Sequence, residues 1–119
     1  MEKHDIPNDL KEQQAEFLSE LKKKHGKMRI GINEVTKAIE RDTAKLVVVA
    51  QDVSPPEVVM HLPLLCKEKR VPISYMDSKK ELGEKVGIGV GAAAIAVIEA
   101  GDAQKELESI VKRLNDLSK

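Results

Sequence analysis

The chain has 119 residues, enough for one domain with a single core. Hydrophobic residues make up 41% and charged residues 34% of the sequence, a balance typical of folded, water-soluble proteins. The longest weakly polar run, residues 86–98, is too short and glycine-rich to cross a bilayer, and no secretory leader is recognisable. We therefore expect a single domain over residues 1–119, located in the cytoplasm without membrane attachment. The lone Cys66 agrees with a reducing compartment.

Charge is unevenly distributed although the net charge is zero. Residues 22–45 contain eight Lys or Arg and three Asp or Glu, a net charge of +5, whereas residues 1–21 carry −4. From charge alone, a solvated helix face followed by a basic loop is the simpler explanation. The chain has no Trp, one Tyr and one Phe, which argues against a platform that stacks single-stranded bases.

Apolar spacing and turn residues predict alternating helices and strands. The predicted helices cover residues 9–24, 33–41 (Asn33 to Arg41), 56–69, 78–86 and 101 onward. Pro63 should bend the third helix or open one of its turns, and Ser78 should cap the fourth. The apolar face of the last helix consists of Leu107, Ile110, Val111, Leu114 and Leu117. The predicted strands cover residues 27–30, 45–50, 71–76 and 92–99. Short buried strands alternating with helices predict an α/β fold, a three-layer α/β/α sandwich around a small four-stranded mixed sheet.

The first candidate site lies at the predicted start of the second helix. Asn33 and Glu34 stand where free backbone N–H groups favour an anion, and Lys37 follows one turn later on the same face. Gly31 precedes them and lets another backbone approach closely. A guanine edge can use all three side chains, because a carboxylate accepts from N1–H and N2–H while Asn and Lys donate to O6 and N7. Taken alone, however, these residues are better explained as helix capping with exposed Glu and Lys.

The second candidate is the glycine loop over residues 87–91. It follows a helix and leads into a strand, the reverse of a phosphate-binding loop, so a nucleotide cradle is not expected. Ile88 and Val90 could instead cup an extruded base, although a glycine-stopped helix with Ile88 in the core is the better interpretation of the pattern alone.

Other chemistry lacks positive support in the sequence. His4, His25 and His61 have no second ligand at metal-binding spacing, and Cys66 stands among leucines as a small apolar residue. No Ser or Cys carries a local signature of a catalytic nucleophile. We therefore expect neither enzymatic activity nor a bound metal or cofactor.

Four segments resemble a known family. Residues 31–41, 44–50, 61–66 and 78–83, and above all the motifs Gly-x-Asn-Glu-x-x-Lys and His-Leu-Pro-x-Leu-Cys, are similar to the kink-turn-binding ribosomal and small-ribonucleoprotein proteins, here the archaeal ribosomal L-seven-Ae type. The resemblance extends over nearly everything after about residue 26.

This resemblance implies specific roles for residues of both candidate sites. Gly31, Asn33, Glu34 and Lys37 would contact the two sheared G·A pairs of a kink-turn. An unpaired, flipped-out nucleotide would be covered by a second set: Val58, Lys79, Ile88, Gly89, Val90 and Gly91.

The chain departs from the usual pattern of that family at three positions. A basic residue commonly precedes the motif glycine; Ile30 stands here instead, and Arg29 is the candidate replacement. Gly89 and Gly91 occupy loop positions where an acidic residue and a proline are common. A more flexible loop with lower nucleotide selectivity is expected.

The function implied by the resemblance is that of a non-enzymatic, RNA-binding assembly protein. Its implied partners are kink-turns in rRNA and in guide RNAs such as box C/D RNA, together with the other core proteins of these RNPs. The roles would be in the large ribosomal subunit, in rRNA 2′-O-methylation and pseudouridylation, and in ribonuclease P, hence tRNA processing. A monomer is expected.

Two rival interpretations remain. One is a divergent paralogue serving as a protein-interaction module, which is favoured only by Ile30 and the altered loop. The other is a nucleotide-dependent enzyme, which would need the glycine loop at a helix start.

Overall fold

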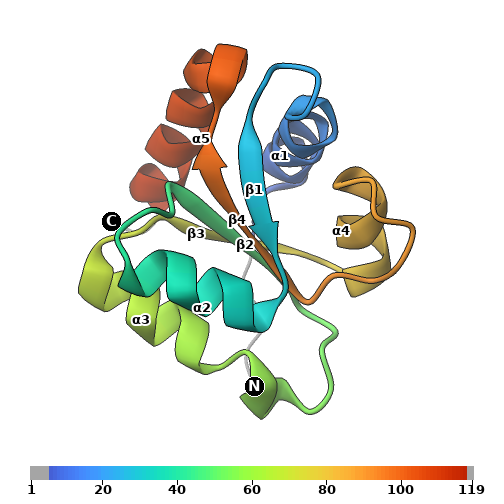
Figure 1. The fold of residues 1–119 in the computed structure, drawn as a ribbon, viewed down its shortest axis with the longest axis vertical. Coiled ribbons are helices and arrows are strands. Elements are labelled where there is room, and N and C mark those ends of the chain that lie inside the picture. The colour runs from blue at the N-terminus through green and yellow to red at the C-terminus, as the bar shows by residue number, and fades with distance from the viewer. Residues whose placement is uncertain (1–5, 118–119) are drawn as a thin grey trace.

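The structure, a computed structural model, describes residues 6–117. Along these residues helices and strands alternate, as Figure 1 shows. The helices are α1 (Asn8–Glu20), α2 (Ile32–Glu40), α3 (His61–Lys69), α4 (Lys79–Lys85) and α5 (Gln104–Leu117), with short 3-10 helices η1 (Pro56–Val58) and η2 (Gly101–Ala103). The strands are β1 (Lys27–Ile30), β2 (Leu46–Ala50), β3 (Ile73–Met76) and β4 (Ala94–Glu99).

The four strands form one mixed sheet in the order β1-β4-β2-β3. Strand β4 pairs antiparallel with both β1 and β2, whereas β2 and β3 are parallel. Strands β1, β2 and β3 therefore run in the same direction and β4 runs in the opposite one. As a result, three strands finish and one begins at the same edge of the sheet, which we call the carboxyl end.

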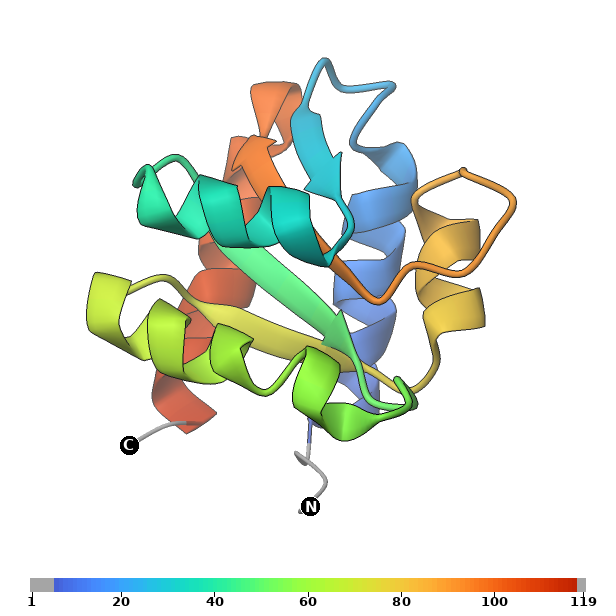
Figure 2. The same ribbon diagram turned by 60° about the horizontal axis from the view of Figure 1, so that its bottom comes forward.

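The sheet is covered by helices on both faces. Its inner strand β2 is apolar and buried at every position, so both of its faces need cover. Leu46, Val48 and Ala50 of β2 pack with α1, α4 and α5, while Val47 and Val49 pack with α2 and α3. Figure 2 shows α2 and α3 side by side in front of the sheet and α1 and α5 behind it. The predicted three-layer α/β/α sandwich around a four-stranded mixed sheet is confirmed.

Helix boundaries differ from the sequence prediction at several places, of which two bear on the candidate site. The first helix ends at Glu20 and not at residue 24, and α5 begins at Gln104, after η2. Helix α2 begins at Ile32 with Gly31 as its N-cap, so Asn33 lies inside the first turn and is not the cap. The helix expected over residues 56–69 is two helices, η1 and α3, separated before His61 and not at Pro63. Pro63 is tolerated because it lies in the first turn of α3, where a backbone N–H has no partner within the helix.

The apolar face of α5 ends earlier than expected. Leu107, Ile110 and Leu114 are buried, whereas Leu117 is 48% exposed because the helix has passed the core by its last residue. The Ser78 cap of α4 is present, with its hydroxyl accepting from the backbone N–H of Glu81 at 3.0 Å.

Candidate nucleic-acid interface

Gly31 produces an immediate turn from β1 into α2. Its φ of +102° lies in a region that side chains disfavour, so a glycine suits this junction. Its carbonyl accepts from the N–H of Val35 at 2.9 Å and so starts the helix. Its own N–H donates to the carbonyl of Ala94 at 2.9 Å, which joins the start of α2 to the start of β4.

The three polar side chains of the first motif stand together on the exposed surface of α2. Asn33, Glu34 and Lys37 are all exposed. The Lys37 Nζ lies 3.7 Å from Glu34 Oε1, and both side chains are about half exposed, with relative exposures of 54% and 52%. An ion pair of this kind adds little stability, so both groups can exchange it for a ligand at small cost.

The glycine loop is anchored to α4 at both of its ends. The N–H of Ile88 donates to the carbonyl of Gly83 at 3.2 Å, and the N–H of Ala92 donates to the carbonyl of Lys79 at 2.9 Å. Gly83 is required for this contact, since a Cβ there would overlap the carbonyl of Val90. The signal that could have revealed it in the sequence is a glycine inside a helix.

The two apolar side chains of the loop have different surroundings. Val90 is 68% exposed, whereas Ile88 is partly buried against the core. The interpretation that places Ile88 in the core is therefore the better one for that residue, and Val90 is the exposed apolar side chain of the loop. A Cβ added to Gly89 would meet open space, whereas one added to Gly91 would lie 3.2 Å from the stem of Lys79.

Lys79 connects the loop to the segment that follows β2. Its backbone N–H donates to the Asp52 carboxylate at 2.8 Å, its carbonyl holds Ala92, and its stem covers Gly91. The Lys79 side chain is exposed and forms no ion pair with another residue among those described, so its charge is available. Asp52 and Lys79 are 27 residues apart in the sequence, so this bridge exists only in the folded chain.

Val58 belongs to η1 and is 40% exposed. It follows β2, as Gly31 follows β1, Lys79 follows β3, and the glycine loop precedes β4. The topology thus brings every residue of both candidate sites to the carboxyl end of the sheet. Figures 1 and 2 both show the start of α2, the segment after β2 and the loop before β4 converging there.

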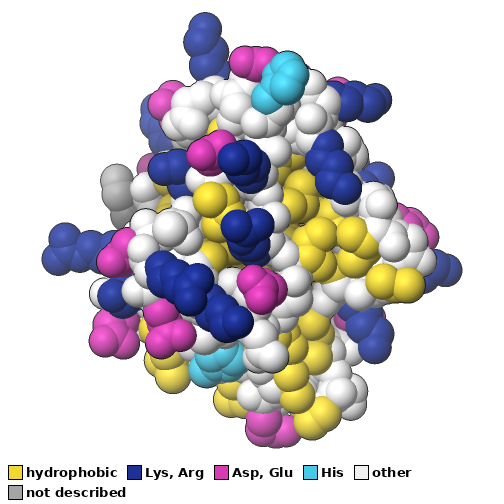
Figure 3. Space-filling model, in the orientation of Figure 1, with side chains coloured by type: hydrophobic (Ala, Val, Ile, Leu, Met, Phe, Trp, Pro, Cys, Tyr) yellow, Lys and Arg dark blue, Asp and Glu magenta, His cyan; other side chains and the backbone are white. Residues whose placement is uncertain are grey.

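The surface at this end combines charge with apolar area. In Figure 3, Lys, Arg, Asp and Glu side chains lie intermingled over α2, and apolar side chains extend beside them from the glycine loop toward η1. Exposed apolar residues at this end are Val58, Met60 and Val90. Such a surface can hydrogen-bond a polar edge and cover a flat apolar face at once.

The two residues before Gly31 lie on opposite faces of the sheet. Ile30 pairs with Ile95 and packs against the core on the α1 side of the sheet. Arg29 pairs with Ala96, which faces α2 and α3, and it is exposed. Arg29 is thus the basic residue of β1 that stands on the α2 side nearest Gly31.

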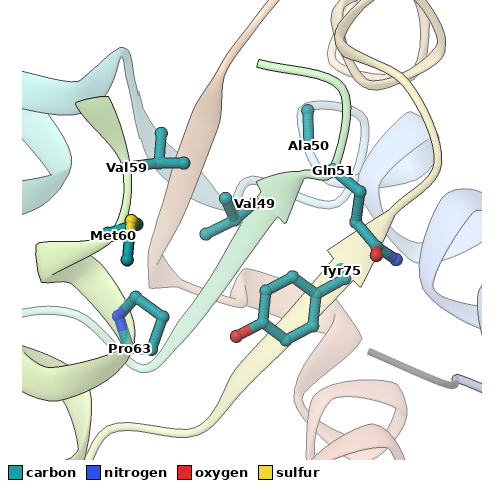
Figure 4. A pocket seen from close by; sticks show the side chains of 7 residues that line it. All are labelled: Val49, Ala50, Gln51, Val59, Met60, Pro63 and Tyr75. Carbon is teal, nitrogen blue, oxygen red and sulfur yellow. The ribbon is translucent and has the colours of Figure 1, made fainter. Parts of the chain in front are cut away.

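A small apolar pocket lies behind η1. It has a volume of 160 Å³ and is lined by Val49, Ala50, Gln51, Val59, Met60, Pro63 and Tyr75. Figure 4 shows Val59, Met60 and Pro63 on the helical side facing Val49 and Tyr75 of the strands. Burial, with a smaller contribution from Cys66, raises the pKa of Tyr75 to about 12. None of the residues predicted for the two candidate RNA-binding sites lines this pocket.

Within residues 6–117, no group of His, Cys, Asp and Glu side chains is arranged to hold a metal ion. No helix in the same range is long and apolar enough to span a membrane.

Comparison with known proteins assigns the chain to a family. Residues 13–107 match the ribosomal protein L7Ae/L30e/S12e/Gadd45 family. The chain belongs to this family. Among solved structures, it is similar to the Giardia lamblia 15.5kD RNA binding protein, with 27% sequence identity and a TM-score of 0.87. The match covers 94% of this chain and 92% of that one.

Membership of the L7Ae/L30e/S12e/Gadd45 family confirms, at the level of the family, the resemblance that the sequence motifs carry. It also confirms that this family member is not an enzyme, as the sequence predicted. The matched range includes both motifs, all strands and the whole carboxyl end of the sheet.

Proposed function

We propose that this family member binds RNA and that it recognises a kink-turn with the carboxyl end of its sheet. The observation that carries the proposal is the convergence there of Asn33, Glu34 and Lys37 with the glycine loop, Lys79 and Val58. The similarity to a protein described as RNA binding supports it.

In this proposal α2 reads the guanines of the two sheared G·A pairs. The Glu34 carboxylate accepts from guanine N1–H and N2–H, and Asn33 and Lys37 donate to O6 and N7. These three side chains are exposed on one helical turn, so they can meet a single base edge together. A regular RNA major groove is too narrow for side chains, whereas a kink widens it and leaves the guanine edges accessible.

The flipped-out nucleotide would lie against the glycine loop. Val90 and Val58 supply apolar surface for its base, and Lys79 supplies a cation for a phosphate. Backbone atoms of Gly89 and Gly91 can approach the nucleotide closely because no side chain intervenes. The partly buried Ile88 supports the loop from below.

Binding to the kinked form alone would shift the RNA from its extended form to the bent one, so the protein would act as a conformational clamp. We extend the proposal to the settings implied by the motifs: the archaeal type of the family, the large ribosomal subunit, guide RNPs for 2′-O-methylation and pseudouridylation, and ribonuclease P. A cytoplasmic monomer that binds first and is then joined by other RNP core proteins belongs to the same proposal.

The test is a titration of the protein with a kink-turn RNA and with the same RNA whose G·A pairs are converted to Watson–Crick pairs. We expect tight binding to the first and weak, salt-sensitive binding to the second. Equal or negligible binding to both would refute the proposal and leave a protein-interaction module as the alternative function of this fold.

A further inference from the structure

The segment between β2 and α3 carries Val58 on the short helix η1. At the start of the segment, the N–H of Gln51 donates to the carbonyl of Met76 at 2.9 Å. The backbone hydrogen bonds around η1 are local: Val58 to Pro55, Val59 to Pro56 and Met60 to Glu57. No residue of η1 itself is buried. The apolar anchors of the segment are Val53, partly buried, and Val59, which is 6% exposed.

Side-chain hydrogen bonds also attach this segment to neighbouring helices near each of its ends. Asp52 accepts from the N–H of Lys79 at the start of α4, at 2.8 Å. At the other end, the ring Nε2 of His61 lies 2.9 Å from the hydroxyl Oγ1 of Thr36 on α2. His61 is only three residues beyond Val58, and Thr36 lies between Glu34 and Lys37.

The direction of the second hydrogen bond follows from the partners of Thr36. Its Oγ1 donates to the carbonyl of Ile32 at 2.8 Å, which uses the single hydroxyl hydrogen. The contact with His61 is therefore satisfied only when the His61 Nε2–H donates and Thr36 Oγ1 accepts. The proton on Nε2 is thus required, and the other ring nitrogen plays no part in the contact.

This bond joins the two halves of the proposed interface. Helix α2 carries the side chains that would read the G·A pairs, and η1 carries an apolar side chain that would cover the flipped-out nucleotide. We propose that the Thr36–His61 hydrogen bond sets the position of Val58 relative to Asn33, Glu34 and Lys37, so that His61 is a positioning residue for nucleotide selection. The inference rests on the proposed function, since it concerns the same RNA.

The experiment compares two kink-turn RNAs that differ only at the protruding position, one with a base and one abasic. The ratio of the two dissociation constants measures what that base contributes. Thr36→Val, which keeps the shape but removes the acceptor, and His61→Ala should each reduce this ratio by about three- to tenfold, the scale of one neutral hydrogen bond. The double variant should lose no more than either single one.

Thr36→Ser is the matched control, because it keeps the oxygen that accepts from His61. It should retain the wild-type ratio, and circular dichroism melts of all variants should show a folded protein. A merely structural role would lower affinity for both RNAs equally and leave the ratio unchanged, and that result would overturn the inference. A ratio of one for the wild-type protein would also overturn it, because the protruding base would then contribute nothing to binding.

The outcome is separable from that of the proposed function. Failure of wild-type protein to prefer kink-turn RNA over its Watson–Crick control removes the proposed function. Retention of that preference with an unchanged base contribution in Thr36→Val and His61→Ala removes only the positioning role.

Discussion

At the scale of a residue, Glu34 lies where it can stabilise the start of α2 by its charge and can also accept hydrogen bonds from a base edge. It lies in the first turn of α2, where the helix dipole stabilises a carboxylate, and its contact with Lys37 is loose at 3.7 Å. Because the contact is exposed, a guanine edge can replace it without a large loss of stability.

We predict that Glu34→Ala weakens kink-turn binding by about 1–3 kcal/mol, the usual cost of losing a base-edge contact. Glu40→Ala is the matched control, since Glu40 is exposed on the same helix and its removal changes the net charge equally. Isothermal titration of both variants decides the matter. Equal losses would mean that charge, and not base recognition, accounts for the effect.

Arg29 is the second residue whose role depends on its orientation. We expect Arg29→Gln to reduce the slope of log affinity against log salt by about one, as loss of one phosphate contact does. Lys27→Gln is the control, because Lys27 lies two residues earlier on β1 and its Nζ is 3.9 Å from the Glu99 carboxylate. Binding measured over a range of salt should distinguish the two. Identical slopes for Arg29→Gln and wild type would exclude the contact.

Cys66 gives a pH-dependent prediction. Burial raises the pKa of its thiol from an ordinary value of 9.0 to about 12. The thiolate is therefore disfavoured in the folded state. The contribution of the neutral Cys66 thiol to the free energy of unfolding is complete below about pH 9 and is lost as the pH rises from there toward 12. Urea unfolding should show a decline of about 3 kcal/mol by pH 11. Cys66→Ala should show a smaller alkaline decline, and parallel declines would contradict the prediction.

At the scale of an element, the glycine loop and α4 behave as one unit. A side chain at position 83 would push the loop away from α4, because its Cβ would overlap the Val90 carbonyl. The hydrogen bonds between the loop and α4 would then be weakened. An alanine in an exposed helix normally stabilises relative to glycine, so the sign of the effect at this position is informative.

We predict that Gly83→Ala lowers the unfolding free energy by about 1–3 kcal/mol and weakens binding of the kink-turn, since the loop must shift. Glu84→Ala, at an exposed position on the same helix, should have little effect on either quantity. Chemical denaturation and RNA titration provide the readouts. A Gly83→Ala protein that is more stable than wild type would show that the loop moves without cost.

The elements themselves were largely predictable from local pattern, and their boundaries less so. The alternation of apolar runs predicted every strand, because a fully buried strand such as β2 is apolar at each position. The division between η1 and α3 was not predicted, because proline usually interrupts a helix and the irregularity was therefore expected at Pro63. The actual break depends on Val59 entering the core, which only the sheet and α2 create.

At the scale of the whole molecule, a buried polar contact joins α1 to β3. The Gln14 amide donates to the carbonyl of Tyr75 at 2.7 Å and accepts from the Ser74 hydroxyl at 2.6 Å, and both Gln14 and Ser74 are fully buried. The contact lies on the face of the sheet opposite α2 and satisfies polar groups of the edge strand β3.

Gln14→Leu should therefore cost about 2–3 kcal/mol of unfolding free energy, because two buried polar groups lose their partner. RNA affinity should stay at the wild-type level, since the contact lies across the sheet from α2. Adding Ser74→Ala should cost less than the sum of the single changes. Additive losses in urea unfolding would contradict a shared contact.

The sequence by itself determined the class of fold and the two motifs, because apolar periodicity and cap residues act over a few neighbours along the chain. It also singled out Gly31, Asn33, Glu34 and Lys37, which are close in sequence. Tertiary structure decided that these residues meet Lys79, Val58 and the glycine loop, since only strand order and direction bring the ends of β1, β2 and β3 beside the start of β4. The bonds from Thr36 to His61 and from Asp52 to Lys79 join residues 25 and 27 positions apart, and no local pattern encodes such a distance.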